Sequence, residues 1–205
     1  MHRVFELRRY TLHPGRRDEL IELFDREFVE SQDAVGAHVV AQYRDLDDAD
    51  QFVWVRGFRD MRARLAALTE FYGGPVWKQH AATANATMAA VDDVLLLRPV
   101  IAPQIEPGSR DSPQRPNVTA LLYPFEAAVT DDDAAAIATM LTGTGIRPVA
   151  LFATLDAPND FPRLPVRAVF RVVALLQDAD DRQWPGDPEV LRLAPTARSQ
   201  TFRWP

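Results

Sequence analysis

The sequence predicts an α+β fold in which a β-α-β-β-α-β unit, the ferredoxin-like arrangement, occurs twice in one chain. Alternating apolar residues mark the strands, and apolar residues three and four positions apart mark the helices between them. Between the two patterns, residues 99–116 hold five prolines and show no periodicity, which is typical of an extended linker. We therefore expect an N-terminal unit at 1–100, a linker at 101–116 and a degenerate C-terminal unit at 117–205.

The elements of the first unit follow from these patterns and from local stop signals. In chain order we expect a strand at 4–12, a helix at 16–32, a hairpin of strands at 37–45 and 51–58, a helix after Asp60, a short helix from Pro75 to about residue 89, and a strand at 92–100. Asp60 can cap the second helix, whose buried face is expected to carry Met61, Leu65, Leu68 and Tyr72.

The second unit repeats the pattern less regularly. In chain order we expect a strand at 117–125, a helix capped by Thr130, strands at 147–155 and 167–177 joined by a proline-rich loop, a short helix from Asp187, and a last strand at 199–205. Because a ferredoxin-like sheet has helices on one face only, the bare faces of the two units can meet. The sequence thus predicts a closed barrel in which the chain is its own pseudo-dimer.

The strands of the first unit have one apolar and one polar face. The apolar face, which we expect under the helices, carries Phe5, Leu7, Val39, Ala41, Tyr43, Val53, Val55, Leu95 and Leu97. Arg9 falls on this side and fits there only near the rim. The polar face carries Glu6, Arg8, Tyr10, His38, Gln42, Trp54, Arg56 and Arg98. We expect this second set to line the lumen of the barrel.

Two interpretations of the polar face compete, because buried charges are costly unless they are paired or hydrated. One is a structural ion cluster in which Glu6 pairs with Arg8 or Arg56. The other is a ligand pocket. In the pocket, an anionic or carbonyl-bearing molecule would be held by three arginines, Arg8, Arg56 and Arg98. Two aromatic side chains, Tyr10 and Trp54, would stack on it.

His80 poses a similar choice. On the helix from Pro75, the side chains of Trp77, His80, Ala84 and Met88 share one stripe. His80 either packs there and forms a hydrogen bond, or reaches the mouth of the barrel as a general base. Tyr10 is the other candidate for moving a proton.

Composition narrows the classes of function. The formal net charge of −6 argues against nucleic-acid binding, and no apolar run approaches the ~18 residues of a membrane span. The chain has no cysteine, and its four histidines (2, 13, 38 and 80) lack metal-ligand spacing, so we expect no metal site. The N-terminus begins directly with a strand pattern and shows no signal peptide, which favours a cytoplasmic location.

Four stretches resemble NIPSNAP-type sequences over residues 4 to about 100: FELRRYTLHPG, FVWVRGFRDM, FYGGPVWKQH with the following ANATM, and DDVLLLRP. The later NDFPRLPVR is similar to a loop of bacterial two-repeat members. The resemblance implies the dimeric α/β-barrel fold, which antibiotic-biosynthesis monooxygenases, small quinol monooxygenases and haem-degrading oxygenases share. Haem-degrading relatives use an asparagine on the first strand, together with a tryptophan and a histidine on the helical segment. Trp77 and His80 resemble that pair, but the first strand has no asparagine, which argues against haem degradation.

The leading hypothesis is that the chain binds a small aromatic or carbonyl-bearing molecule in the barrel lumen. If it is an enzyme, we expect monooxygenase-like or isomerase-like chemistry without a cofactor, with His80 or Tyr10 as the proton carrier. The ligand contacts would come from Glu6, Arg8, His38, Gln42, Trp54, Arg56, Trp77 and Arg98. The alternative is a non-catalytic binding or interaction protein whose lumen is filled by side chains, and a third possibility is haem or flavin binding. A homodimer beyond the internal pseudo-dimer is also left open.

Overall fold

The computed structural model describes residues 2–105, 110, 115–179 and 183–203 of the chain. The first half contains, in order, β1 (Val4–Leu12), α1 (Arg17–Leu23), the π-helical turn η1 (Phe24–Phe28), α2 (Val29–Ala34), β2 (His38–Asp45), β3 (Gln51–Phe58), α3 (Met61–Gly73), α4 (Pro75–Asn85) and β4 (Met88–Ile101). The second half contains β5 (Gln104–Ile105), β6 (Val118–Phe125), α5 (Asp131–Gly143), β7 (Ala150–Thr154), β8 (Phe170–Gln177), β9 (Glu189–Pro195) and β10 (Phe202–Arg203).

Eight antiparallel strands close into a barrel, as the sequence predicts. The order around the barrel is β1-β3-β2-β9-β6-β8-β7-β4. Each half contributes four neighbouring strands, in the orders β4-β1-β3-β2 and β9-β6-β8-β7. The two sets join where β2 pairs with β9 and where β4 pairs with β7, so neither half closes a barrel alone.

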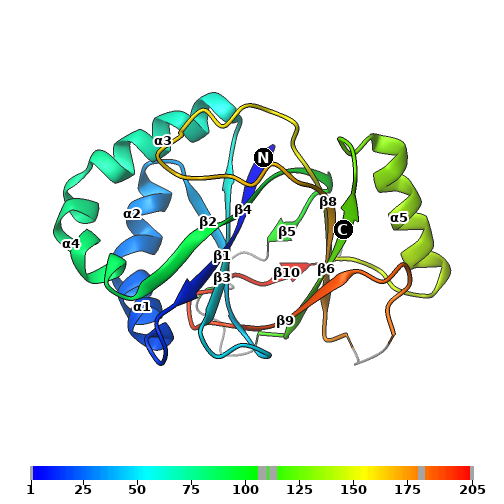
Figure 1. Cartoon of the computed structure of the whole chain (residues 1–205), viewed down its shortest axis with the longest axis horizontal. Helices are drawn as coiled ribbons and strands as arrows, with labels where there is room; N and C mark the ends of the chain where they lie inside the picture. The colour runs from blue at the N-terminus through cyan, green and yellow to red at the C-terminus, as the bar shows by residue number, and fades with distance from the viewer. Residues whose placement is uncertain (1, 106–109, 111–114, 180–182, 204–205) are drawn as a thin grey trace.

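The helices cover only the outside of this barrel, and they are distributed unevenly (Figure 1). Helices α1 to α4 form a layer over the strands of the first half, whereas α5 stands against the second half. Helix α5 begins with a capping box, in which the Thr130 hydroxyl accepts a hydrogen bond from the Asp133 amide and the Asp133 carboxylate accepts one from the Thr130 amide.

The end of the chain differs from the expected pattern. No helix begins at Asp187, because residues from Glu189 onward form β9, the eighth strand of the barrel. The expected last strand at 199–205 is reduced to β10, which pairs with β5 in a separate two-stranded ribbon, and residues 204–205 lie outside the described part. Of the expected linker, residues 106–109 and 111–114 also lie outside it.

The interior of the barrel is filled by apolar side chains. One buried cluster contains residues from all eight barrel strands and from no helix, so it can only lie in the lumen. Phe5 of β1 and Phe152 of β7, which are not neighbours in the sheet, have ring centroids 5.0 Å apart across this space. The expectation that the apolar face lies under the helices is therefore wrong for Phe5, Leu7, Ala41, Tyr43, Val53, Val55, Leu95 and Leu97.

A closed lumen explains why the apolar face turns inward. Side chains there meet only one another, and apolar groups can fill such a space at little cost in lost hydrogen bonds. Val39 alone of the expected set lies on the helix side, as expected, because a bulge between Val39 and Ala41 shifts the alternation of β2 there.

Every second side chain of β1 points into the lumen. Arg9 continues this alternation and lies at the rim of the barrel, as expected. Arg9 Nη1 lies 2.5 Å from Glu189 Oε1 of β9 and 3.4 Å from Asp93 Oδ2 of β4. Arg171 of β8 contacts the same glutamate at 3.3 Å. Because β1 and β9 are not adjacent strands, these ion pairs span the mouth of the barrel.

Candidate functional site

The polar face of β1 and β3 lies between the sheet and the helical layer, and it does not face the lumen. Glu6, Arg8 and Arg56 are fully buried there, and Arg64 of α3 joins them. The Glu6 carboxylate receives all three arginines. Arg8 Nη1 and Arg56 Nη2 each lie 2.7 Å from its Oε2, and Arg64 Nε lies 2.7 Å from its Oε1.

The geometry keeps this cluster ionised. Burial by itself raises the pKa of Glu6, but the charges of Arg56, Arg8 and Arg64 outweigh burial and hold that pKa below its usual value. Burial opposes the charge of Arg8 as well, yet its polar neighbours Tyr10 and Glu6 raise its pKa overall. One carboxylate therefore faces three guanidinium groups, and the buried centre carries an excess of positive charge.

Several donors of the cluster have no acceptor within the described residues. They are Nη2 of Arg8 and of Arg64, together with the indole Nε1 of Trp54. Buried donors are almost always paired with protein or water, so these three donors can each give a hydrogen bond to water or to a ligand. The nearby rings hold the arginines in place, since the guanidinium carbon of Arg56 lies 5.1 Å and that of Arg8 lies 5.6 Å from the Trp54 ring centre.

A cavity of about 30 Å³ lies beside the cluster, between the sheet and the helices. It is lined by Tyr10, Leu20, Phe24, Phe28, Gln32, Trp54, Phe71, Tyr72, Trp77, Ala84 and Met88. Gln32 links the cavity to the charges, because its Oε1 accepts a hydrogen bond of 2.9 Å from Arg56 Nη1. The turn η1 contributes Phe24 and Phe28 to this wall, and π-helical turns are frequent at functional sites.

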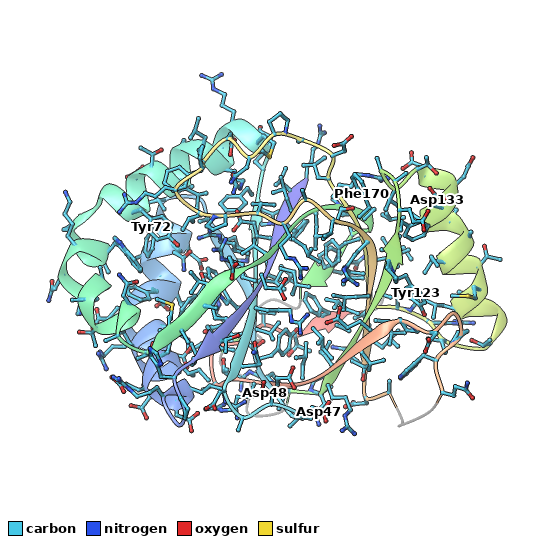
Figure 2. All side chains as sticks on the ribbon, viewed as in Figure 1. Asp47, Asp48, Tyr72, Tyr123, Asp133 and Phe170 are labelled. Carbon is cyan, nitrogen blue, oxygen red and sulfur yellow. The ribbon has the colours of Figure 1, made fainter. Side chains whose placement is uncertain are left out.

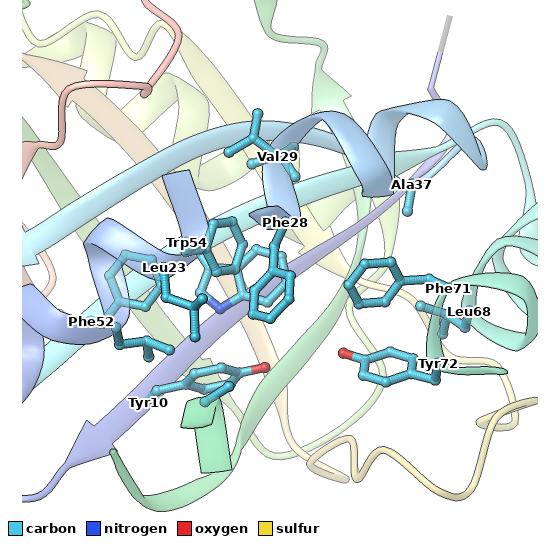
Figure 3. Packing of buried hydrophobic residues seen from close by; sticks show 14 of the residues in the cluster. Tyr10, Leu23, Phe28, Val29, Ala37, Phe52, Trp54, Leu68, Phe71 and Tyr72 are labelled. Atoms are coloured by element: carbon cyan, nitrogen blue, oxygen red, sulfur yellow. The ribbon is translucent and has the colours of Figure 1, made fainter. Parts of the chain in front are cut away.

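Two phenol groups face each other at this cavity. Figure 3 shows the hydroxyl oxygens of Tyr10 and Tyr72 pointing toward one another from the strand side and the helix side. The Tyr10 oxygen accepts a hydrogen bond of 2.9 Å from Arg8 Nε, which leaves its own hydrogen free to be donated. Burial raises the pKa of Tyr10 more than Arg8 lowers it, so this phenol stays protonated at neutral pH. The polar end of the cavity thus presents donors.

The structure brings together only part of the predicted set. Glu6, Arg8, Tyr10, Trp54 and Arg56 meet around the cavity and the charge cluster, and Trp77 joins them from α4. Gln42 is buried on the same side of the sheet but lies next to Asp25.

Three other predicted residues lie elsewhere. His80 faces η1, where its Nε2 lies 3.5 Å from Glu27 Oε2, and it does not line the cavity. His38 stacks on His2 at a centroid distance of 5.1 Å and contacts Asp33. Arg98 pairs with Asp131 at the start of α5.

Sequence reasoning missed Arg64 and Tyr72 as site residues, and it missed Asp160, whose carboxylate pairs with Arg64 Nη1. Arg64 shares a helical face with Leu68 and Phe71, a three- and four-residue spacing that the sequence shows. Leu65, expected on the buried face, is 40% exposed. Nothing local in the sequence places Asp160 next to α3.

The described residues contain neither a membrane-spanning helix nor a group of metal-binding side chains. No helix there is long and apolar enough to cross a membrane. In the same residues, no three histidine, aspartate or glutamate side chains are grouped so that they could hold a metal ion.

The lumen and the charged cluster differ in whether they leave room and hydrogen-bond donors for a ligand. A filled lumen is the outcome expected for the non-catalytic alternative, and it removes the lumen as the ligand site. The unpaired donors and the cavity lie on the opposite side of the same strands. The candidate site of the first half therefore lies between the sheet and the helices.

Comparison with known proteins supports the fold. The sequence model of the NIPSNAP family matches residues 5–102. A candidate monooxygenase from Lactobacillus acidophilus is 15% identical with a TM-score of 0.58, and the alignment covers 99% of this chain and 100% of that one. Another from Fusobacterium nucleatum is 9% identical with a TM-score of 0.57 and coverage of 99% and 95%. A NIPSNAP family protein of unknown function from Agrobacterium tumefaciens is 16% identical with a TM-score of 0.44 and coverage of 48% and 88%. No curated protein sequence matches this chain.

Proposed function

Because residues 5–102 of this chain match the sequence model of the NIPSNAP family, we propose that the chain uses this segment to bind a small planar aromatic molecule with an acidic oxygen. The ligand lies between the sheet and the helices. Its ring occupies the aromatic cavity, and its oxygen, ionised or becoming so, accepts hydrogen bonds from Tyr10, Tyr72 and the arginines behind them.

One observation carries the proposal: three buried nitrogen donors beside the cavity, on Arg8, Arg64 and Trp54, have no acceptor among the described residues. A purely structural cluster is expected to satisfy its own donors, since each unpaired buried donor costs about 1–3 kcal/mol. An oxygen with a negative charge supplies several acceptor positions at once and balances the excess of guanidinium charge.

The cavity walls favour a flat, apolar ligand body. Rings of Phe28, Phe71, Tyr72 and Trp77 stand around the space, and aromatic faces pack well against another ring. A space of about 30 Å³ holds one or two water molecules. An aromatic ligand therefore displaces these side chains outward when it binds, and we expect the movement on the helix side, away from the paired strands.

As chemistry, we propose a monooxygenation that needs no cofactor. An aromatic ketone with an acidic CH₂ group loses a proton to solvent water and forms an enolate. The enolate carbon is oxidised by dioxygen to a peroxide anion, which takes a proton back from solvent to give a hydroperoxide. Loss of water from the hydroperoxide leaves a second carbonyl, so that CH₂ and O₂ become C=O and H₂O. Arg8, Tyr10 and Tyr72 would stabilise the enolate oxygen. The two full-length structural neighbours, both candidate monooxygenases, support this class only by analogy.

The binding step is tested with 2-naphthol, whose absorption spectrum distinguishes the neutral and ionised forms, and with naphthalene, which lacks the oxygen. We expect 2-naphthol to bind more tightly than naphthalene and to ionise at lower pH when bound, since positive charge favours the naphtholate. Y10F and Y72F should each weaken 2-naphthol binding about tenfold and leave naphthalene unaffected.

Two results would contradict the proposed binding function. If neither compound binds, or if both bind equally and bound 2-naphthol ionises as it does in water, the cluster is structural only.

We also propose that the chain is a tandem pseudo-dimer, with units at 1–100 and 117–205 joined by the linker at 101–116. Support comes from the strand order, in which each half arranges its first to fourth strands as 4-1-3-2. Expression of residues 1–100 alone tests the division, and a folded homodimer with a closed barrel is the expected result.

A further inference from the structure

The second half sends one segment across to the site of the first half. Residues 155–169, here called the strap, leave the barrel after β7 and return to it at β8. Figure 1 shows this yellow-to-gold segment extending over α3 on the far side of the molecule from α5. Four of its apolar side chains pack against the aromatic core of the first half: Leu155, Phe161, Leu164 and Val166.

Both ends of the strap are tied to the strand that flanks the charge cluster. The Leu155 amide donates to the Leu96 carbonyl at 2.8 Å, and the Arg167 amide donates to the Val94 carbonyl at 2.9 Å. Leu96 and Val94 stand opposite Glu6 and Arg8 in the pairing of β4 with β1. The strap is thus fixed to the barrel at the level of the site.

The tip of the strap is stiff and contacts the site directly. Asn159 Nδ2 donates to the Leu164 carbonyl at 2.8 Å, and the Phe161 amide donates to Asn159 Oδ1 at 3.2 Å, while prolines at 158, 162 and 165 restrict the backbone. This turn presents Asp160 to Arg64 and lays the Phe161 ring on Tyr72, with ring centroids 6.0 Å apart at an angle of 28°.

We propose that Asp160 and Phe161 are positioning residues for the ligand site of the first half. Asp160 fixes Arg64 Nη1, so that Nε meets Glu6 and Nη2 stays available to the ligand oxygen. Phe161 fixes the Tyr72 ring, which points its hydroxyl at Tyr10. The inference rests on the proposed function, and it assigns to the second half the task of completing a site that it does not itself contain.

The test uses the whole chain and the 2-naphthol probe. D160N removes the charge that holds Arg64, while D156N alters an exposed aspartate of the same strap and serves as the matched control. We expect D160N to weaken binding about tenfold and to shift the ionisation of bound 2-naphthol back toward its value in water, with D156N unchanged and D160E partly restored. F161A should weaken binding similarly, and F161Y should restore it.

Two outcomes separate the inference from the function it rests on. If the wild-type chain binds 2-naphthol and D160N binds it identically with the same ionisation, the inference is wrong even if D160N melts at a lower temperature. If the wild-type chain does not bind the probe, the proposed function fails, and NMR of the Arg64 Nε–H group decides the inference. A changed shift and faster exchange in D160N, absent in D156N, support positioning, whereas an unchanged signal overturns it.

Discussion

The outer faces of the two halves solve the same packing problem in different ways. In the second half, α5 covers strands whose outward residues are apolar, among them Leu121, Val172 and Ala174. In the first half, α1 to α4 cover strands that carry Glu6, Arg8 and Arg56 in the corresponding layer. Figure 2 shows Tyr72 on the first side and Tyr123 and Asp133 on the second.

This difference serves as an internal control. Both halves use the same strand order in one barrel, yet among the described residues only the first half buries a cluster of charges. The same strand arrangement therefore forms in the second half without such a cluster, and the desolvation of four charged groups needs another explanation. Ligand binding is that explanation in our proposal.

The largest effect on stability is expected when the central carboxylate of the cluster is removed. E6Q leaves Arg8, Arg56 and Arg64 buried without their shared anion, so we expect the free energy of unfolding to fall by about 3–5 kcal/mol. Urea unfolding measures it. As a control, E126Q changes an exposed glutamate of the second half, and a loss for E6Q as small as for E126Q would contradict the account.

The converse change makes the first half resemble the second. Replacing Glu6, Arg8, Arg56 and Arg64 together by leucine removes every charge of the cluster. We expect the free energy of unfolding to stay at the wild-type value or to rise by about 1–4 kcal/mol, because apolar replacements of buried ion clusters are often neutral or stabilising. Binding of 2-naphthol should be lost. A variant that fails to fold would show that the charges are part of the fold.

The dependence of stability on acid pH also tests the difference between the charged first half and the apolar second half. The pKa of Glu6 is lowered in the folded chain, so its contribution to stability is complete above its usual pKa of 4.5 and is lost as the pH falls below that value. The wild type should therefore lose stability more steeply below pH 4.5 than the fourfold leucine variant, by up to about 1.4 kcal/mol per pH unit. Parallel curves from urea titrations at several pH values would show that Glu6 is not ionised in the cluster.

The smallest expected effect concerns His80. H80A removes a partly exposed pair with Glu27, which is worth about 0–1 kcal/mol, and it leaves the cavity lining intact. The dissociation constant of 2-naphthol should change less than twofold, in contrast to Y72F. A loss of binding as large as that of Y72F would return His80 to the site.

The sequence predicts the barrel because its strands alternate so regularly, and the hairpin of β2 and β3 lies where expected. Alternation identifies two faces of a strand but does not say which one turns inward. Here the closed lumen takes the apolar set, and the polar set lies under the helices, against the expectation. Contacts between halves, such as Asp160 with Arg64, depend on the path of a loop that has no period to read.

The two halves belong to one polypeptide, and the pairing of β2 with β9 and of β4 with β7 joins them into one barrel. In a symmetric pair of identical subunits, every substitution appears twice, so a gain at one site is repeated at its twin. A single gene that encodes both halves lifts that restriction. In this chain the first half carries the buried charges, while the second half carries apolar residues in the corresponding layer and contributes the strap.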